Sequence, residues 1–422
     1  MKTAILIGAG NRGTEAYGAY ALANKDKLKF VAVAEPNDYR RNHFKVFHHI
    51  EDKYSVKDWK DLLRFPKIAD IAIIATLDQL HKETALAFLD LGYDILIEKP
   101  VAPTIEESVE IIKKAKEKNR YIMTAYVLRF SDFYTKIKHL IDSQVTGEIV
   151  TVEQQEHIGF WHYAHSYVRG RWRNSKEVGP ILHTKSCHDL DILQWLLGKE
   201  CLQIYSVGNL KHFRKENFPK NADQRCLDCQ LKDSCPYSAT KIYLNMDNND
   251  WPVNTITNDL SYEGRIQALR STNFGRCVYL MDNDVVDNQF VIMKFKRNIN
   301  VLFTLNAFTH DKTRKIRING TKGEIFGDFE KNTIEVSKFS DKKKEIIEIR
   351  PKYNVGHQGS DFMLIDAFLQ QLDSKEKPDY YNLIESHFMA YAAETSRLNN
   401  IVVDYPNYRS QIIKKNEEKE KQ

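Results

Sequence analysis

The N-terminal stretch TAILIGAGNRG, residues 3–13, is an apolar, β-branched strand that runs directly into a glycine-rich turn. The spacing of Gly8, Gly10 and Gly13 is typical of a turn whose backbone approaches a pyrophosphate and whose following helix packs on the strand. The next expected strand, KFVAVAE, ends at Glu35, where an acid can bind a ribose 2′-hydroxyl. The sequence therefore predicts dinucleotide binding, with a purely structural glycine turn as the alternative.

Glu35 also bears on the choice of coenzyme. A carboxylate at this position repels a 2′-phosphate, which favours NAD over NADP. Arg40 and Arg41 follow closely and keep NADP open as the alternative.

Two further strands are expected at residues 69–76 and 93–98, and both are continuous apolar runs, as in a parallel sheet covered on both faces. In an open α/β sheet, ligands bind at the carboxyl ends of the strands. The polar residues at these ends are Glu35, Thr76, His81, Glu98 and Lys99.

The bulk composition narrows the class of protein. A chain of 422 residues is long enough for two domains, and 42% hydrophobic with 28% charged residues is typical of a globular protein. The net charge of +5 is mild, and no basic stripe with interleaved aromatics indicates nucleic acid. No apolar run reaches the length of a membrane span, and the N-terminus lacks a signal-peptide pattern, so a cytoplasmic location is expected.

Four motifs together resemble the Gfo/Idh/MocA oxidoreductases, the glucose-fructose oxidoreductase and inositol dehydrogenase group: GAGNRG, ATLDQLH, GYDILIEKPVAPTIEES and CHDLDILQWLLG. The resemblance implies an NAD-binding Rossmann domain over residues 1–125. It further implies a substrate-binding and oligomerisation α/β domain over residues 126–422, built on an open, mostly antiparallel sheet. A tightly held nicotinamide cofactor, a small carbohydrate substrate and a homodimer or homotetramer formed through the open sheet face are also implied.

The resemblance also implies site residues. The lysine of the EKP motif, Lys99, is expected against the substrate hydroxyl and the nicotinamide, and the proline after it often follows a cis peptide bond. The expected cofactor contacts are Gly8, Gly10, Asn11, Arg12, Gly13, Glu35, Thr76, His81, Glu98, Lys99 and Arg129.

In the family, a helix carries Asp-x-x-x-His-x-x-Asp, which lines the substrate. Here His188 and Asp191 match this pattern, but Thr184 replaces the first Asp and Lys185 follows it. We expect Lys99, His188 and Lys185 to be catalytic and Asp191 to contact substrate. Lys185 is expected either to act on Lys99 as a like charge or to bind an anionic substrate group.

The segment from His157 to Asn174 is dense in aromatic, histidine and arginine residues and is interpreted as a substrate lid, although it could instead fill a subunit interface. A further substrate contact is expected downstream, and residues 274–295 are expected to form a pair of strands. The expected substrate contacts outside the helix are His157, Trp161, Arg169, Trp172 and His357.

Cys226, Cys229 and Cys235 form a C-x2-C-x5-C pattern within an insertion near residues 212–240. Such spacing in a reducing compartment favours a structural zinc ion, with unbound reduced thiols or a redox or iron–sulfur role as alternatives. Zinc takes four ligands, and we expect His212 to be the fourth, with Cys187 as the second choice.

The leading functional hypothesis is an NAD(P)-dependent dehydrogenase that oxidises a ring hydroxyl of a sugar, inositol or sugar derivative. One alternative is an NAD-dependent glycoside-cleaving enzyme that uses transient C3 oxidation and elimination. The other is a non-catalytic sensor of NAD and sugar, which has no need of the Lys99 and His188 pair.

Overall fold

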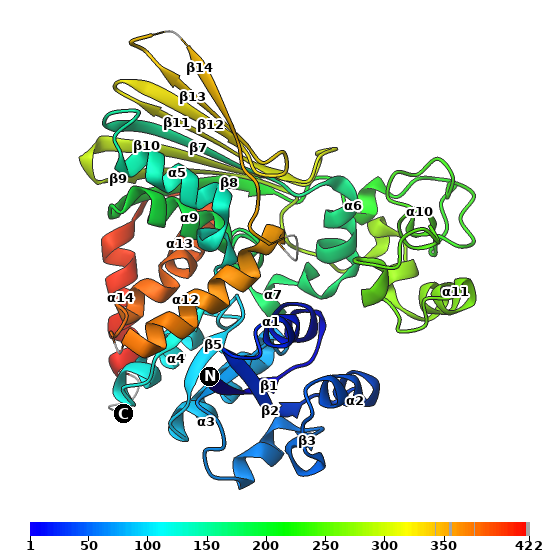
Figure 1. Cartoon of the computed structure of the whole chain (residues 1–422). Coiled ribbons are helices and arrows are strands. Elements are labelled where there is room, and N and C mark those ends of the chain that lie inside the picture. The colour runs from blue at the N-terminus through cyan, green and yellow to red at the C-terminus, as the bar shows by residue number, and fades with distance from the viewer. Residues whose placement is uncertain (342, 354–356, 375, 419–422) are drawn as a thin grey trace.

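The computed structural model describes residues 1–341, 343–353, 357–374 and 376–418. Two β-sheets organise the chain, a parallel sheet in the N-terminal part and a larger mixed sheet in the rest (Figure 1). A layer of helices lies between the larger sheet and the N-terminal part. The predicted fold class, a Rossmann fold followed by an α/β domain on an open sheet, is confirmed.

The first sheet is parallel and has the strand order β3-β2-β1-β4-β5-β6. The strand order reverses at β1, and this reversal leaves a ligand crevice at the carboxyl ends of β1 and β4. The strands are β1 (Lys2–Ile7), β2 (Leu28–Ala34), β3 (Ser55–Val56), β4 (Ile71–Ile74), β5 (Asp94–Ile97) and β6 (Ile122–Thr124).

Helices connect these strands, as expected for βαβ units. Thr104 begins the longest of them, because its side chain accepts a hydrogen bond from the backbone N–H of Glu107. The helices are α1 (Ala19–Ala23), preceded by the helical turn Arg12–Gly18, then α2 (Asp38–Phe47), α3 (His81–Asp90) and α4 (Ile105–Glu117).

The second sheet has nine strands in the order β14-β13-β12-β11-β7-β10-β9-β8-β15. Its neighbouring strands run antiparallel, except for the parallel pair β7 and β10, so the prediction of a mostly antiparallel sheet is confirmed. The strands are β7 (Ile149–His157), β8 (Cys201–Asn209), β9 (Asn288–Phe295), β10 (Ile299–Asn306), β11 (Thr313–Gly320), β12 (Gly323–Asp328), β13 (Thr333–Lys338), β14 (Lys344–Glu348) and β15 (Val403–Asp404).

Helices cover one face of this sheet, and the described residues leave the other face bare (Figure 1). Side chains along β9 alternate between buried and exposed, and Phe290 and Ile292 on the bare face are 48% and 55% exposed. The helices of this domain are α5 (Asp132–Asp142), α6 (Phe160–Tyr163), α7 (Ser175–Val178), α8 (Ile181–Thr184), α9 (Cys187–Leu197), α12 (Ser360–Ser374), α13 (Glu385–Asn399) and α14 (Tyr405–Glu418). Among the described residues, none of the helices has both the length and the apolar character that crossing a membrane needs.

The chain between β8 and β9 forms a separate lobe, here called the cysteine-rich lobe, that contains α10 (Ala239–Tyr243) and α11 (Tyr262–Ser271) (Figure 1). The lobe is longer than the predicted insertion near residues 212–240. It has a small core of its own, formed by Cys226, Ala239, Tyr243, Ile256, Ala268 and Leu269.

The prediction of a strand pair over residues 274–295 is wrong for its first half, where only short helical turns precede β9. The physical reason lies at Asp287, whose carboxylate accepts hydrogen bonds from the backbone N–H groups of Lys211 and His212 at 2.9 and 2.7 Å. This acid therefore holds the base of the lobe closed at the start of β9 and does not face a partner strand.

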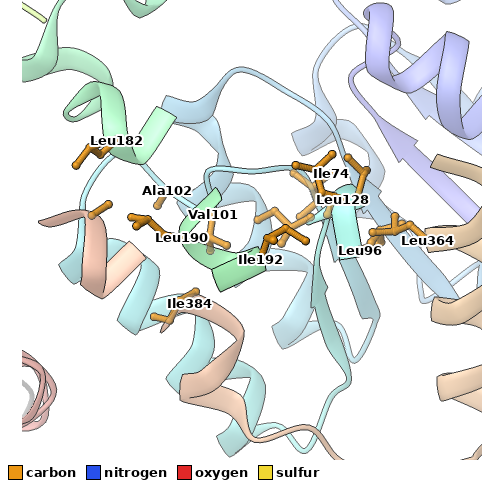
Figure 2. Close-up of a cluster of buried hydrophobic side chains, with 14 of the residues drawn as sticks. Ile74, Leu96, Val101, Ala102, Leu128, Leu182, Leu190, Ile192, Leu364 and Ile384 are labelled. Carbon is orange, nitrogen blue, oxygen red and sulfur yellow. The ribbon is translucent and has the colours of Figure 1, made fainter. Parts of the chain in front are cut away.

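One continuous core joins the two sheets. Figure 2 shows Ile74 and Leu96 of the first sheet in the same cluster as Ile192 of α9 and Leu364 of α12. Val101, which follows the EKP motif, lies inside this cluster and is fully buried. The chain after Lys99 is thus packed between the two domains.

Candidate active site

The glycine-rich turn after β1 has the shape that dinucleotide binding requires. Gly8 adopts a φ of +95°, and a Cβ there would lie 2.5 Å from the carbonyl oxygen of Ala75, while a Cβ at Gly13 would lie 2.1 Å from the carbonyl oxygen of Gly8. Around a Cβ at Gly10, by contrast, the described part of the chain leaves open space to 4 Å. Gly8 and Gly13 therefore shape the turn, and the space at Gly10 fits the close approach of a pyrophosphate.

Glu35 lies beside this turn with its carboxylate held in place. Its two oxygens accept hydrogen bonds from the backbone N–H groups of Ala9 at 2.9 Å and Asn37 at 3.0 Å. The Arg41 guanidinium donates to the Glu35 carbonyl oxygen at 2.7 Å and pairs with Asp38. Glu35 is thus placed to bind a ribose. Arg41, one of the two arginines that could favour NADP, binds the Glu35 backbone and Asp38.

Arg12 and Glu98, both expected to contact the cofactor, contact each other. The Arg12 Nε donates to Glu98 at 2.7 Å, and its two terminal nitrogens donate to both carboxylate oxygens of Asp361 in α12, at 2.9 and 2.7 Å. The Tyr17 hydroxyl donates to the same Glu98 oxygen at 2.7 Å. This network, in which Arg12 is half-buried and its partners are buried, ties the glycine-rich turn to the second domain.

Lys99 follows β5 and reaches toward the second domain. Its Nζ donates a hydrogen bond to the carbonyl oxygen of Thr184 at 2.9 Å and lies 5.9 Å from the centre of the Trp172 ring. The Trp172 Nε1 donates to the Asp78 carboxylate at 3.0 Å, so the lid contacts the ATLDQLH motif. The Lys99–Pro100 peptide bond is cis, as the resemblance implies.

Helix α9 begins just after Thr184 and carries His188 and Asp191. The His188 ring is 8% exposed and lies edge-on to Tyr126, with 6.2 Å between ring centres. Asp191 is bound by the Arg129 guanidinium through two hydrogen bonds of 2.7 and 2.5 Å, and burial raises its pKa above the usual value. Asp191 and Arg129, expected on substrate and cofactor respectively, therefore bind each other.

Lys185 belongs to a buried network of four charges. Its Nζ lies 3.2 Å from a carboxylate oxygen of Glu156. The Arg314 guanidinium lies between two carboxylates, with a nitrogen 2.6 Å from Glu156 and another 2.9 Å from Asp189. Burial lowers the pKa of Lys185, and the positive charges of Arg314 and Lys99 lower it further against the opposing effect of Glu156. Burial also raises the pKa of Asp189 to about 6. Whether Lys185 acts on Lys99 as a like charge or binds an anionic group of the substrate stays a prediction.

The predicted lid contributes an aromatic wall. The Trp161 ring lies 5.4 Å from Trp251 of the cysteine-rich lobe, and the His162 ring lies 4.8 Å from the same Trp251. Burial lowers the pKa of His162 well below its usual value, and the nearby charges of Lys185 and Lys312 add to this effect. Trp251 therefore brings the lobe to the edge of the site.

These two domains match one family of proteins. Residues 2–126 match the model of the Gfo/Idh/MocA oxidoreductase family, NAD-binding Rossmann fold, and residues 138–387 match the model of its C-terminal alpha/beta domain. The chain belongs to the Gfo/Idh/MocA oxidoreductase family. The resemblance in the four sequence motifs is thereby confirmed.

Individual Gfo/Idh/MocA relatives are distant. The putative oxidoreductase YteT of Bacillus subtilis (strain 168) is 23% identical over 334 residues, which cover 75% of this chain and 76% of that protein. An inositol 2-dehydrogenase of Salmonella paratyphi B is 26% identical over 156 residues, 35% of this chain and 43% of the relative. The solved structure of a levoglucosan dehydrogenase in complex with NADH and L-sorbose aligns over 97% of this chain and 100% of that one, with a TM-score of 0.71 and 18% identity.

The remaining predicted site residues of this Gfo/Idh/MocA protein differ in how far they are buried and in what they contact. His81 is fully buried, and its Nδ1 lies 2.9 Å from the Pro100 carbonyl oxygen. Asn11 is exposed at the glycine-rich turn and Thr76 is half-buried just after β4. His157 ends β7 with its Nε2 at 3.2 Å from Gln155. The side chain of His357 lies outside the described residues.

Arg169 of the lid, expected on the substrate, contacts the cysteine-rich lobe between β8 and β9. The side chain is 2% exposed, its Nε donates to the Arg276 carbonyl oxygen and a terminal nitrogen donates to the Tyr237 carbonyl oxygen, both at 2.8 Å. The same terminal nitrogen lies 3.4 Å from the Cys226 Sγ. Two of its nitrogens thus hold the lobe to the lid, and a contact between Arg169 and the substrate stays a prediction.

The predicted zinc site is not supported. Among the residues that the structure describes, no three His, Cys, Asp or Glu side chains are arranged to hold a metal ion. His212 lies at 3.0 Å from the Tyr279 hydroxyl through its Nε2, and Cys187 is buried in α9 beside His188. Neither of these two residues lines the cavity of about 160 Å³ that is lined by Cys226, Cys229, Cys235 and Cys277.

Sequence reasoning missed several residues that shape the site. Glu156 pairs with Lys185, and Arg314 pairs with Glu156, but neither Glu156 nor Arg314 lies in a motif that we identified. Asp78 lies in the ATLDQLH motif, but nothing in the sequence indicated its hydrogen bond with Trp172. The sequence held one weak sign of Glu156: this acid directly precedes His157, a candidate substrate residue, at the end of a strand.

Proposed function

We propose that this Gfo/Idh/MocA protein is an NAD-dependent dehydrogenase that oxidises a ring hydroxyl of a sugar, an inositol or a sugar derivative. The observation that carries the proposal is the position of Lys99, at the ligand edge of the parallel sheet with its Nζ on the Thr184 carbonyl of the second domain. A dinucleotide beside Gly10 and a small molecule held by the second domain would meet at this amine. Relatives named inositol 2-dehydrogenase and levoglucosan dehydrogenase support this substrate class.

The chemistry divides between cofactor and chain. Bound NAD supplies the acceptor for a hydride from the substrate carbon. The chain must take the hydroxyl proton in the same step, and we assign this work to Lys99 and His188. In place of the family's first Asp, the backbone carbonyl of Thr184 orients the Lys99 amine, and a carbonyl can do this without an acidic side chain.

The substrate class is tested with a panel of sugars, uronates and inositols, followed by the absorbance of NADH. Accumulation of NADH with at least one ring alcohol is the expected result. The alternative function, glycoside cleavage, remains because Thr184 replaces an acid of the family pattern. Release of an aglycone without net NADH would favour that alternative, and binding of NADH and sugar without either product would favour a sensor.

The position of Glu35 predicts the coenzyme preference. Wild type is expected to bind NADH more tightly than NADPH, and Glu35→Ser is expected to raise the affinity for NADPH relative to NADH about tenfold, because a nearby carboxylate repels the 2′-phosphate. Fluorescence titration of both reduced coenzymes measures this ratio. Asp52→Ser, at an acid in the same domain that is 92% exposed, should leave the ratio unchanged. Equal affinities in the wild type would contradict the assignment.

The bare face of the second sheet supports a homodimer or homotetramer. Large apolar side chains on it are exposed, among them Phe290, Ile292 and Val207 at 48%, 55% and 44%. Such a contiguous apolar face is a common feature of interaction surfaces. Light scattering of the purified protein, compared with an Ile292→Lys variant, tests this assignment, and a monomeric wild type would contradict it.

A further inference from the structure

The four residues after Lys99 have backbone groups held by the side chains of three buried histidines and one half-buried tyrosine. His81 Nδ1 lies 2.9 Å from the Pro100 carbonyl oxygen, and His387 Nε2 lies 3.0 Å from the Val101 nitrogen. His183 Nε2 lies 2.7 Å from the Ala102 carbonyl oxygen, and the Tyr391 hydroxyl donates to the carbonyl oxygen of the next residue.

The holding residues come from three separate helices. His81 begins α3 of the Rossmann domain, His183 lies in α8, and His387 and Tyr391 lie in α13. All three imidazoles are fully buried. Figure 2 shows that Val101 and Ala102 are also surrounded by apolar side chains of the second domain. The segment is therefore fixed from both domains, by hydrogen bonds as well as by packing.

The hydrogen-bond pattern defines the tautomers of His183 and His387. The Val101 N–H must donate to an unprotonated Nε2 of His387, so a neutral His387 carries its proton on Nδ1, which lies 2.6 Å from the Tyr126 oxygen. His183 must donate from Nε2 to a carbonyl oxygen, so its other nitrogen is unprotonated when the ring is neutral. The two rings lie edge to face with 4.5 Å between their centres.

Burial keeps both rings neutral. It lowers the pKa of His183 to about 4, and it lowers the pKa of His387 well below the usual value, with the positive charge of Lys99 adding to the effect on His387. A protonated His387 would lose the acceptor that Val101 uses. Neutral imidazole, with one donor and one acceptor on a rigid ring, suits this place better than a charged side chain.

The helix that carries His183 also carries the partner of the Lys99 amine. His183 holds the Ala102 carbonyl, and the next residue, Thr184, accepts the hydrogen bond from Lys99 Nζ. Helix α8 therefore holds both the backbone of the segment, at Ala102, and the side-chain amine of Lys99. A displacement of the segment would move the amine relative to α9, which follows directly.

We propose that His81, His183 and His387 are positioning residues that form a neutral histidine clamp, which holds residues 100–102 and so fixes the Lys99 amine for catalysis. The clamp rests on the proposed function for its effect on turnover, but its hydrogen bonds can be tested without turnover.

The test compares three substitutions in the full-length chain loaded with NAD. His387→Leu removes both hydrogen bonds, His387→Gln restores an acceptor for the Val101 N–H, and Met389→Leu is a matched control at a buried residue of the same helix. On the sugar found by the screen, His387→Leu should lower kcat about 10- to 100-fold, the loss expected when a catalytic group is misplaced, and leave KM and NADH affinity within about twofold. His387→Gln should recover kcat to within about fivefold of wild type.

Nitrogen-15 spectra of histidine-labelled protein supply a readout that does not depend on turnover. The His387 signal, assigned by its loss in His387→Gln, should show an unprotonated Nε2 and a protonated Nδ1 throughout the range from about pH 5 to about pH 8, in which an ordinary histidine titrates. A His387 signal that titrates in this range, or that shows the opposite tautomer, would overturn the clamp. So would a His387→Leu variant with wild-type kcat, or a His387→Gln variant no better than His387→Leu.

The two readouts separate the two proposals. If no sugar in the panel is turned over by the wild type, the proposed function fails, and the nitrogen signals alone decide whether the clamp exists. If His387→Leu does not fold, the spectra of wild type and the kcat of His387→Gln against Met389→Leu still decide it.

Discussion

Replacing Lys99 by alanine is expected to lower kcat about 100- to 10,000-fold, while the affinity for NADH changes by less than about threefold. The physical reason is that loss of the amine removes the group that takes the hydroxyl proton as hydride leaves. The amine has few other roles in the structure, since within the described part of the chain its one hydrogen bond is to the Thr184 carbonyl. Steady-state kinetics on the sugar found by the screen and fluorescence titration with NADH measure the two quantities.

Two further lysine variants make the result specific. Lys82→Ala removes a lysine of the same domain whose Nζ pairs with Glu110 at 2.6 Å on the surface, and kcat should remain at the wild-type level. Lys99→Arg keeps the positive charge but cannot give up its proton at physiological pH, so it should be nearly as inactive as alanine. Turnover that survives in Lys99→Ala would refute the catalytic assignment, and an active Lys99→Arg would reduce Lys99 to an electrostatic role.

The centre of the Rossmann sheet could be predicted from sequence, whereas its two edge strands, β3 and β6, were not expected. The expected strands at residues 69–76 and 93–98 contain β4 (Ile71–Ile74) and β5 (Asp94–Ile97). Strands buried on both faces give continuous apolar runs, and glycines whose Cβ would collide with backbone are dictated by local geometry. Both signals are local, which is why a single sequence reveals them.

The side chains that position the site could not be predicted in the same way. His387 holds Val101 across 286 residues, and Arg314 holds Asp189 across 125 residues. No periodicity or spacing encodes such pairs, because they depend on how the two domains pack. The contacts of Arg169 are hidden from the sequence for the same reason: its place in an arginine-rich lid suggested substrate, and only the structure shows that the lobe accepts hydrogen bonds from two of its nitrogens.

The cysteine pattern shows a similar limit. The C-x2-C-x5-C spacing correctly brings three thiols to one cavity, and Cys277, some distance along the chain, joins them there. His212 was chosen as a ligand by proximity in sequence, yet it lies in an aromatic cluster, with 5.4 Å between its ring centre and that of Tyr237. Nearness along the chain does not place a donor atom.

Arg314→Met is expected to lower the free energy of unfolding by about 3–5 kcal/mol, the usual cost of removing one partner from a buried ion pair. Arg314 contacts two carboxylates, and the side chains of Glu156 and Asp189 are 2% and 0% exposed. Without the guanidinium, Asp189 loses its cation and Glu156 keeps only Lys185. Urea denaturation measures the change in the free energy of unfolding.

The same strand offers a matched control. Arg317 of β11 pairs with Glu324 at 2.9 Å, but its side chain is 42% exposed. Arg317→Met should therefore cost only about 0–1 kcal/mol, because water screens an exposed pair. Adding Asp189→Asn to Arg314→Met should recover part of the loss, since the buried carboxylate that has lost its cation is then removed.

The penalty of Arg314→Met should also depend on pH. In the wild type, burial alone would raise the pKa of Glu156, yet Arg314 and Lys185 hold it below its usual value, whereas burial raises the pKa of Asp189 to about 6. Without Arg314, the pKa of each carboxyl in the folded protein should lie above its value in the unfolded chain. Their contribution to the free energy of unfolding is therefore present at low pH and is lost as the pH rises through the folded pKa values. The difference in unfolding free energy between wild type and Arg314→Met should thus be larger at about pH 8 than at about pH 5. A difference that is constant or shrinks over this range would show that Arg314 contributes through packing and not through its charge.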